Sequence, residues 1–495
     1  MKGRIVFLLL VGLCSGFVQV PVHRLIQYDY EGTSFGSQVA SFNFLGAHFK
    51  NESEVPRKIA LIHETSLTQE TLENTIALKP SALLIILSSG VGLTREIQVY
   101  LGSNTFPFPI YFAYETPELL EVYESLLVTG EQTIDSDQLQ FSILSEEKSL
   151  VKNLQQENFY GFAYEFSENL STIGIVTYLD AFSVIPELTK GVDSNGSGVI
   201  IALELIRLMK KVYDKSPAPY NLLFVFTSSG TTNLQGLRPW ATTEESELQQ
   251  KRGNILFALC LDTLGQSDKL YMHVSRFQKD GEIELTNIYS QFNSTAEKSD
   301  ILLDYKKKKV NMADSFVPWQ NEIFAKNKIV LATLSHLENS RRGIFDYSSV
   351  FDDKLDMDIF KRNIKFVAES LAKYLYCVEN TAMFSKADVL KTTYLEEIVE
   401  NFKELNRYPA KMTPGSKFSN YFQGILKELG FNFKVQKFSA PDVTPYNLKQ
   451  ESLSVYKVKP AMLDLYIFLG VLGYLAVLWL VIKFFGKNFI KVKKN

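Results

Sequence analysis

A glycine-rich stretch, GVDSNGSGV at 191–199, places a carboxylate where it could take part in chemistry. The stretch follows a strand-like run at 172–178 and opens a helix-like run at 199–213, and its glycines allow a tight turn between them. Asp193 is therefore expected at the mouth of an α/β fold, where such folds place their sites. A carboxylate just before a helix N-terminus is also favoured without any metal. Asn195 and Ser197 are expected to cap the helix.

Strand-like and helix-like runs alternate on both sides of this turn and predict an α/β fold. Residues 21–150 are expected to form a small N-terminal α/β lobe, with strands at 57–63, 82–87 and 110–114 and helices at 67–78 and 116–128. Residues 151–380 are expected to form a larger domain with buried strands at 172–178, 220–227, 254–262, 270–274 and 329–335 and a closing helix at 355–376. Helical patterns at 387–405 and 419–429 predict a lumenal connector over 381–460. The lysine run at 306–309 is expected in a solvated loop.

Both ends of the chain carry targeting signals. Residues 1–20 are typical of a signal peptide, with Lys2 and Arg4 before an apolar run and small residues at its end. Residues 463–483 are long and apolar enough to cross a bilayer, and the lysine-rich tail at 484–495 predicts that this flank is cytosolic. Lys491 and Lys493 match a retrieval signal of endoplasmic reticulum membrane proteins, with a merely basic membrane flank as the alternative. The prediction is a single-pass type I protein of that membrane with a lumenal ectodomain.

Glycosylation motifs agree with a lumenal ectodomain. Asn51, Asn169 and Asn293 are candidate acceptors, whereas Asn195 lies inside the glycine-rich turn and is expected to be folded away. The net charge of −3 provides no basic excess to neutralise phosphates, which argues against a nucleic-acid partner. Removal of the signal peptide leaves two cysteines, so this is not a disulfide scaffold.

Short segments in a fixed order resemble the motifs of the two-zinc aminopeptidases of the M28 type. They are YLD at 178–180, GVDSNGSG at 191–198, LCLD at 259–262 and SH at 335–336. The resemblance covers roughly residues 160–378 and implies a three-layer α/β fold. It assigns Asp193 to the carboxylate that bridges the two ions, Asp262 to one ion, and Asp180 to the residue that orients the first histidine ligand; His336 could match the last ligand. The length, the single span and the lysine tail resemble the nicalin and nicastrin branch of this superfamily, and its shorter, cysteine-poor nicalin side more closely.

The resemblance fails at the residues that the chemistry needs. Tyr178 stands at the position of the first histidine ligand, and a neutral phenol is a poor substitute for imidazole at neutral pH. The family's Glu-Glu pair, a zinc ligand and the general base, should lie in the segment TSSGTTNLQG at 227–236, which has no acidic residue. Such a site cannot run the hydrolysis. We predict no peptidase activity, no metal and no cofactor, and we interpret Asp180, Asp193, Asp262 and His336 as the remains of a lost zinc site.

The resemblance then implies a non-catalytic scaffold in the endoplasmic reticulum membrane. It implies a complex with a Nodal-modulator-type lumenal protein and a small multipass membrane protein, beside the Sec translocon, that assists the biogenesis of multipass membrane proteins; the family is also linked to Nodal signalling and receptor assembly. No small-molecule substrate is expected. Two alternatives stay open: an M28-type zinc enzyme with an altered site on Asp193, Asp262 and His336, and a nicastrin-like substrate receptor of an intramembrane protease.

Overall fold

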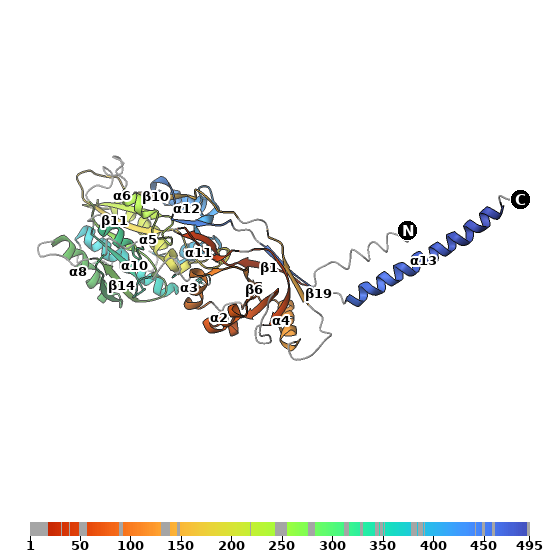
Figure 1. The fold of residues 1–495 in the computed structure, drawn as a ribbon. Coiled ribbons are helices and arrows are strands. Elements are labelled where there is room, and N and C mark those ends of the chain that lie inside the picture. Colours follow the sequence, from red (N-terminus) through yellow and green to blue (C-terminus); the bar gives the residue numbers. More distant parts are fainter. Residues whose placement is uncertain are drawn as a thin grey trace.

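The fold is described from a computed structural model of the 495-residue chain. The described residues are 18–30, 32–38, 40–48, 57–88, 93–129, 139–145, 149–217, 219–242, 255–275, 283–310, 316–326, 330–341, 346, 350, 352–377, 384, 390, 392–440, 442–447, 451–457 and 461–492. In Figure 1 they form an elongated body from which one long helix projects.

The lobe nearest that helix is a closed barrel. Its strands follow one another in the order β1 (Val18–Arg24), β19 (Glu451–Lys457), β9 (Leu139–Ile143), β4 (Phe42–His48), β5 (Lys58–His63), β6 (Ala82–Leu87) and β8 (Ile110–Tyr114). Strands β4, β5, β6 and β8 are parallel, and β8 meets β1 in antiparallel register to close the ring. Apolar side chains such as Leu61, Leu84 and Leu453 are fully buried in it, and α4 (Pro117–Thr129) packs on the same core.

The larger domain is built on an eight-stranded sheet. The order is β15 (Leu302–Lys307), β14 (Lys269–Val274), β16 (Leu331–Ser335), β13 (Ile255–Leu261), β11 (Thr172–Tyr178), β12 (Asn221–Thr227), β10 (Gln155–Phe162) and β17 (Asn432–Ser439). The four central strands β16, β13, β11 and β12 run parallel. Strands β11 and β12 are buried along their whole length, as expected for strands covered on both faces.

Helices and the barrel lobe cover the two faces of this sheet, which confirms the predicted three-layer α/β fold. One face packs against helices α5 (Ser197–Tyr213), α8 (Ile283–Lys298), α10 (Met357–Tyr376), α11 (Thr392–Glu404) and α12 (Lys417–Glu428). The other face shares a core with α6 (Leu237–Thr242), α9 (Gln320–Lys326) and the side of the barrel lobe that carries α2 (Gln69–Ala77) and α3 (Arg95–Ser103). A small sheet of β18 (Val443–Pro445), β2 (Gln27–Tyr30), β3 (Thr33–Ser37) and β7 (Thr105–Phe106) lies between the two bodies.

The structure differs from the prediction of a separate connector at 381–460. Helices α11 and α12 pack on the core of the large domain, β17 forms an edge of its sheet, and β19 enters the barrel. The barrel lobe is therefore not confined to residues 21–150, because β19 comes from the far end of the chain. Helical periodicity revealed α11 and α12, but it gave no sign of the long-range strand pairs.

Two other boundaries are also corrected. Strand β1 begins at Val18 and pairs with β19, so residues 18–20 of the predicted signal peptide overlap this strand, while its remaining residues lie outside the described ones. Lys306 and Lys307 belong to edge strand β15 instead of a loop, and Lys306 forms ion pairs with Asp304 and Glu338 at 3.3 and 2.9 Å.

Helix α13 (Ala461–Val492) contains the predicted span. Residues 465–483 are long and apolar enough to cross a membrane, and their side chains are exposed along the whole stretch. In Figure 1 the helix starts beside β19 and points away from the body. Of the two lysines in the predicted retrieval signal, Lys491 lies in this helix, whereas Lys493 lies outside the described residues.

Candidate functional site

The predicted site residues meet at one edge of the large sheet. Tyr178 ends β11, Asp180 follows it, Asp262 directly follows β13, and His336 directly follows β16. Because these strands are parallel, their carboxyl ends lie at the same edge, where α/β folds place their sites. The glycine-rich turn brings Asp193 to this edge at the start of α5.

Asp262 is held by an arginine. Both guanidinium nitrogens of Arg341 donate to its carboxylate, Nη1 to Oδ2 at 2.8 Å and Nη2 to Oδ1 at 3.3 Å. The hydroxyl of Tyr178 donates to Oδ1 at 2.9 Å. Only about 4% of Arg341 and 2% of Asp262 side-chain surface is exposed. A buried carboxylate needs a positive partner, and here a guanidinium provides the charge that a zinc ion provides in a metallopeptidase.

Tyr178 and Asp180 also contact the segment at 227–236, in which the family's Glu pair was expected. The ring of Tyr178 packs so closely on Gly230 that a Cβ at residue 230 would lie 2.2 Å from it. Asp180 accepts hydrogen bonds from the backbone N–H groups of Gly230 and Thr231, at 2.7 and 2.9 Å, and from the Thr231 hydroxyl. Residues 227–236 are all buried. The structure thus fills this region with packed backbone and offers no carboxylate from it.

Asp193 and His336 form the other half of the site. The Asp193 Oδ2 atom lies 3.6 Å from His336 Nδ1, and the N–H of Gly265 donates to Asp193 Oδ1 at 2.6 Å. Burial raises the pKa of Asp193 to about 6. Burial also lowers the pKa of His336, so this imidazole is neutral at pH 7 and adds no charge beside Asp193.

The glycine-rich turn is fixed by residues from elsewhere in the chain. Gly191 has a left-handed backbone (φ +66°), and the carboxylate of Asp352 accepts the N–H groups of Asp193 and Ser194 at 3.0 and 2.5 Å. Beneath the turn, the fully buried Arg407 donates to the carbonyl oxygens of Gly191 and, at 2.7 Å, of Leu179. Burial lowers the pKa of Arg407 to about 10, which leaves it charged at neutral pH.

The predicted helix caps were wrong. Gly196 is the N-cap of α5, with no side-chain cap hydrogen bond. Asn195 is fully buried and donates to the carbonyl of Tyr178, while Ser197 donates to the carbonyl of Asp193 at 3.0 Å. These side chains therefore tie the turn to the strand and to itself. Burial of Asn195 agrees with its expected exclusion as a glycan acceptor.

A cavity of about 390 Å³ remains beside Asp193. It is lined by Leu93, Arg95, Gln98, Asp193, Ser194, Thr263, Gln266, His336, Leu337, Asn339, Arg341, Asp346 and Asp352. The barrel lobe contributes α3, whose Arg95 forms a bidentate pair with the buried Asp346 of the large domain (Nη2 to Oδ2, 2.5 Å). The cleft at this sheet edge is thus a polar cavity between the two bodies.

The donor set does not fit a pair of zinc ions. Within the described ranges no three His, Cys, Asp or Glu side chains are grouped so that they could hold a metal ion. Asp262 faces Arg341, and a metal at that position would have to displace a buried cation from its carboxylate. No reaction step through a metal is derived for this site.

Three residues that shape the site were missed in the sequence. Arg341, Asp352 and Arg407 lie outside the segments that resemble the peptidase motifs, and Arg407 stands in the predicted connector. A lone arginine or aspartate has no periodicity or spacing that marks it. Only the fold shows that Arg341 pairs with Asp262 and that Asp352 and Arg407 bind the backbone around the glycine-rich turn.

The raised pKa values of Asp193 and Asp352 predict an effect on stability. Burial, followed by the charge of Asp193, raises the pKa of Asp352 to about 7, against about 4 in an unfolded chain. Between these values the folded state binds more protons than the unfolded state, so the contribution to stability falls as pH rises from about 4 to 7. The free energy of unfolding of Asp352→Asn should therefore rise relative to that of the parent protein as the pH increases from 5 to 7.5. Denaturant unfolding of the full-length chain measures this difference.

The control is Asp356→Asn at the exposed N-cap of α10, where asparagine caps equally well. Its difference from the parent should not change with pH. If the difference in stability between Asp352→Asn and the parent were also independent of pH, the raised pKa of Asp352 would be contradicted.

Comparison with known proteins agrees with this geometry. Residues 170–335 match Peptidase family M28. The chain is 28% identical to "BOS complex subunit ncln" of Danio rerio, over 94% of this chain and 90% of that protein, and 22% identical to "Nicalin" of Caenorhabditis elegans, over 92% and 88%. The crystal structure of the gamma-secretase component nicastrin has the same fold, with a TM-score of 0.65 at 10% identity over 90% of this chain and 100% of that chain. The predicted resemblance to the nicalin and nicastrin branch is confirmed.

Proposed function

Because this chain is a homologue of nicalin along almost its whole length, we propose that it is a non-catalytic subunit of a membrane-protein complex. The name of the zebrafish relative, a subunit of the BOS complex, supports membership in an assembly of several proteins. We extend the proposal to a scaffold of the endoplasmic reticulum that works beside the Sec translocon and assists the biogenesis of multipass membrane proteins.

One observation carries the non-catalytic part of the proposal. Asp262, a zinc ligand in the peptidases that the motifs resemble, is bound on both oxygens by the guanidinium of Arg341 and on one by the Tyr178 hydroxyl. Zinc-dependent hydrolysis needs open carboxylate and imidazole ligands and a general base to activate water. Here one ligand is neutralised, and the segment that should supply the base is buried and lacks acidic residues.

The proposed location is the endoplasmic reticulum membrane, with the ectodomain in the lumen. Residues 465–483 of α13 would cross the bilayer, and the lysines that follow would face the cytosol. Asn169 and Asn293 are exposed and remain candidate glycan acceptors, whereas Asn51 lies outside the described residues. The proposed retrieval signal is formed by Lys491 and Lys493.

The proposed partners follow from the nicalin resemblance. They are a large Nodal-modulator-type lumenal protein, a small multipass membrane protein and the translocon itself. The elongated shape in Figure 1 suits a scaffold, because it provides surface along the barrel lobe and the large domain in addition to the membrane helix. A link to Nodal signalling or receptor assembly would be a consequence of such a complex.

The proposal predicts an assembled protein without zinc. The full-length chain, purified in mild detergent from endoplasmic reticulum membranes without chelators, should contain well under one zinc per chain and release no product from aminoacyl-nitroanilide substrates. The same sample should hold the lumenal and multipass partners in constant ratio to the chain. Metal analysis, the activity assay and quantitative mass spectrometry on one preparation measure all three.

Asp193→Ala and Asp262→Ala variants provide the comparison. Stoichiometric zinc, with turnover that either substitution abolishes, would contradict the proposal and favour the altered-site metalloenzyme. A metal-free, inactive chain that purifies alone would refute membership in the complex while leaving the loss of catalysis intact.

A further inference from the structure

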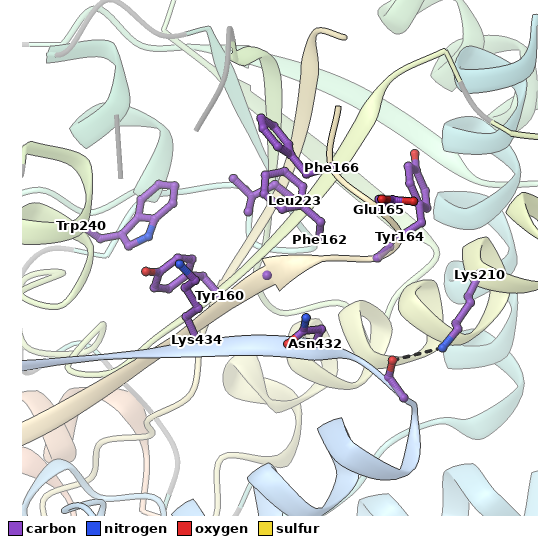
Figure 2. A pocket seen from close by; sticks show the side chains of 13 residues that line it. Tyr160, Phe162, Tyr164, Glu165, Phe166, Lys210, Leu223, Trp240, Asn432 and Lys434 are labelled. Atoms are coloured by element: carbon purple, nitrogen blue, oxygen red, sulfur yellow. Dashed lines mark hydrogen bonds between the residues drawn. The ribbon is translucent and has the colours of Figure 1, made fainter. Parts of the chain in front are cut away.

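Another cavity in the described part of the chain shares no lining residue with the one beside Asp193. It has a volume of about 540 Å³ and lies where β10 and β17 run side by side (Figure 2). Aromatic side chains line it, with Phe162 and Phe166 in contact at a ring-centre distance of 4.7 Å and Trp240 and Tyr160 close by. Figure 2 also shows Lys434 beside Tyr160. The cavity is therefore an apolar pocket with a charged rim.

The pocket lies on one face of the sheet at its margin. Antiparallel register pairs Tyr160 with Lys434 and Phe162 with Asn432, so these four side chains share that face. Elsewhere the same face is covered by α6, α9 and the barrel lobe. At the end of β10 the described residues leave the aromatic side chains half-buried, and Tyr160, Phe162 and Phe166 keep part of their surface accessible.

Strand β17 lies at the edge of the sheet that the described strands form. All eight of its residues pair with β10 on one side, and no described strand pairs with the other side. Val435 is 39% exposed, and exposed positions recur along the strand. An edge of this length presents a row of backbone donors and acceptors that another chain can bind.

The charge around this edge is positive. Strand β17 carries Lys434 and Lys437, both exposed, and contains no acidic residue. Lys210 lies at the same rim, where its Nζ donates to the carbonyl of Gly430 at 3.1 Å. Glu165 is the acidic side chain among the residues that line the pocket. Lys437 lies opposite Glu157 of β10, so the edge carries a small positive excess, which favours an acidic partner.

We propose that the outer edge of β17 binds an extended acidic segment of a partner protein, which adds to the sheet as a further strand. Backbone hydrogen bonds to β17 would hold the segment, and alternate side chains would point to the two faces of the sheet. On the pocket face, a side chain of the segment would lie across from Lys434, its neighbour on the adjacent strand. The inference goes beyond the proposed function and does not depend on it, since the observations that support it concern only β10, β17 and their neighbours.

Full-length protein in nanodiscs and a fluorescent peptide test the proposal. The peptide is as long as β17, alternates glutamate with phenylalanine or valine, and is blocked at both ends. We expect saturable binding that weakens with salt. Methylation of every second backbone nitrogen gives two isomers, and only one removes the N–H groups that face β17; that isomer should bind about tenfold more weakly and the other nearly as well as the parent peptide.

Protein variants locate the site. Lys437→Glu should weaken binding about tenfold, whereas Lys307→Glu on β15, the other edge strand of the same sheet, should leave it unchanged. Unchanged thermal unfolding of each variant shows that the fold is intact. No binding, equal binding of the two methylated isomers, or equal loss for Lys437→Glu and Lys307→Glu would each overturn strand addition at β17.

Discussion

Arg341→Met should destabilise the protein by about 3–5 kcal/mol, because it leaves the buried carboxylate of Asp262 without its positive partner. The remaining side-chain donors to this carboxylate, the Tyr178 hydroxyl at 2.9 Å and the Thr263 hydroxyl at 3.3 Å, are both neutral. The methionine retains most of the apolar volume of the arginine stem, so the effect measures charge and hydrogen bonding rather than a cavity. Denaturant unfolding of the full-length protein, followed by circular dichroism, gives the free energy.

Two comparisons make this result specific. The double variant Arg341→Met with Asp262→Asn should recover much of the loss, because neither buried charge remains. Arg362→Met breaks the ion pair of Arg362 with Asp268, which is half-exposed and 3.6 Å long, and should cost under about 1 kcal/mol. A loss for Arg341→Met as small as that for Arg362→Met would show that Asp262 does not depend on the guanidinium.

The Arg341 pair explains how buried carboxylates are accommodated at this sheet edge by the chain's own residues. A peptidase of this kind gathers carboxylates at the ends of parallel strands, where their mutual repulsion and burial require positive charge. In this chain Arg341 neutralises Asp262, Asp180 is satisfied by the 230–231 backbone, and burial raises the pKa values of Asp193 and Asp352. Each of these carboxylates is thus accommodated by hydrogen bonding, charge pairing or a raised pKa within the fold.

The sequence was a reliable guide wherever a local pattern determines the structure. Strands at 82–87, 110–114 and 172–178 were predicted with the bounds that the structure gives, because buried parallel strands are continuous apolar runs. The motifs likewise identified Asp180, Asp193, Asp262 and His336, and the structure places all four at one sheet edge. Whether these residues are the remains of a zinc site stays an interpretation based on the family resemblance.

Features that depend on distant residues escaped the sequence. Strand β17 contains polar and charged residues at most positions, because an edge strand is exposed, and β19 completes a barrel whose other strands lie more than 300 residues earlier. The prediction that Asn195 and Ser197 cap the helix was wrong because it also depends on a distant residue. Asn195 and Ser197 are good capping residues by type, but a carboxylate from residue 352 already accepts the N–H groups of the turn.

Arg407→Met should have an effect of similar size to Arg341→Met, about 3–5 kcal/mol. The guanidinium of Arg407 is fully buried, binds the carbonyl oxygens of Leu179 and Gly191, and lies 4.9 Å above the ring of Phe402. Its loss orphans two buried carbonyl groups, and each orphaned group costs roughly 1–3 kcal/mol. Arg407→Lys should recover only part of the loss, because an ammonium cannot reach both carbonyls with the planar fork of a guanidinium. Denaturant unfolding measures both variants.

Gly196→Ala tests whether the glycine-rich turn packs directly against Arg407. A Cβ at residue 196 would lie 2.9 Å from Nη2 of Arg407 and 2.8 Å from the carbonyl oxygen of Gly191, so the substitution alone should cost about 1–3 kcal/mol. In the Arg407→Met background one of these two contacts is absent, and the added cost of Gly196→Ala should be smaller, giving a coupling energy of at least about 0.5 kcal/mol. Lys403→Met, which removes an exposed pair with Glu400 on α11, serves as the control and should change stability by under about 0.5 kcal/mol. Strict additivity of Gly196→Ala and Arg407→Met would mean that the two residues do not share the packing that the structure assigns to them.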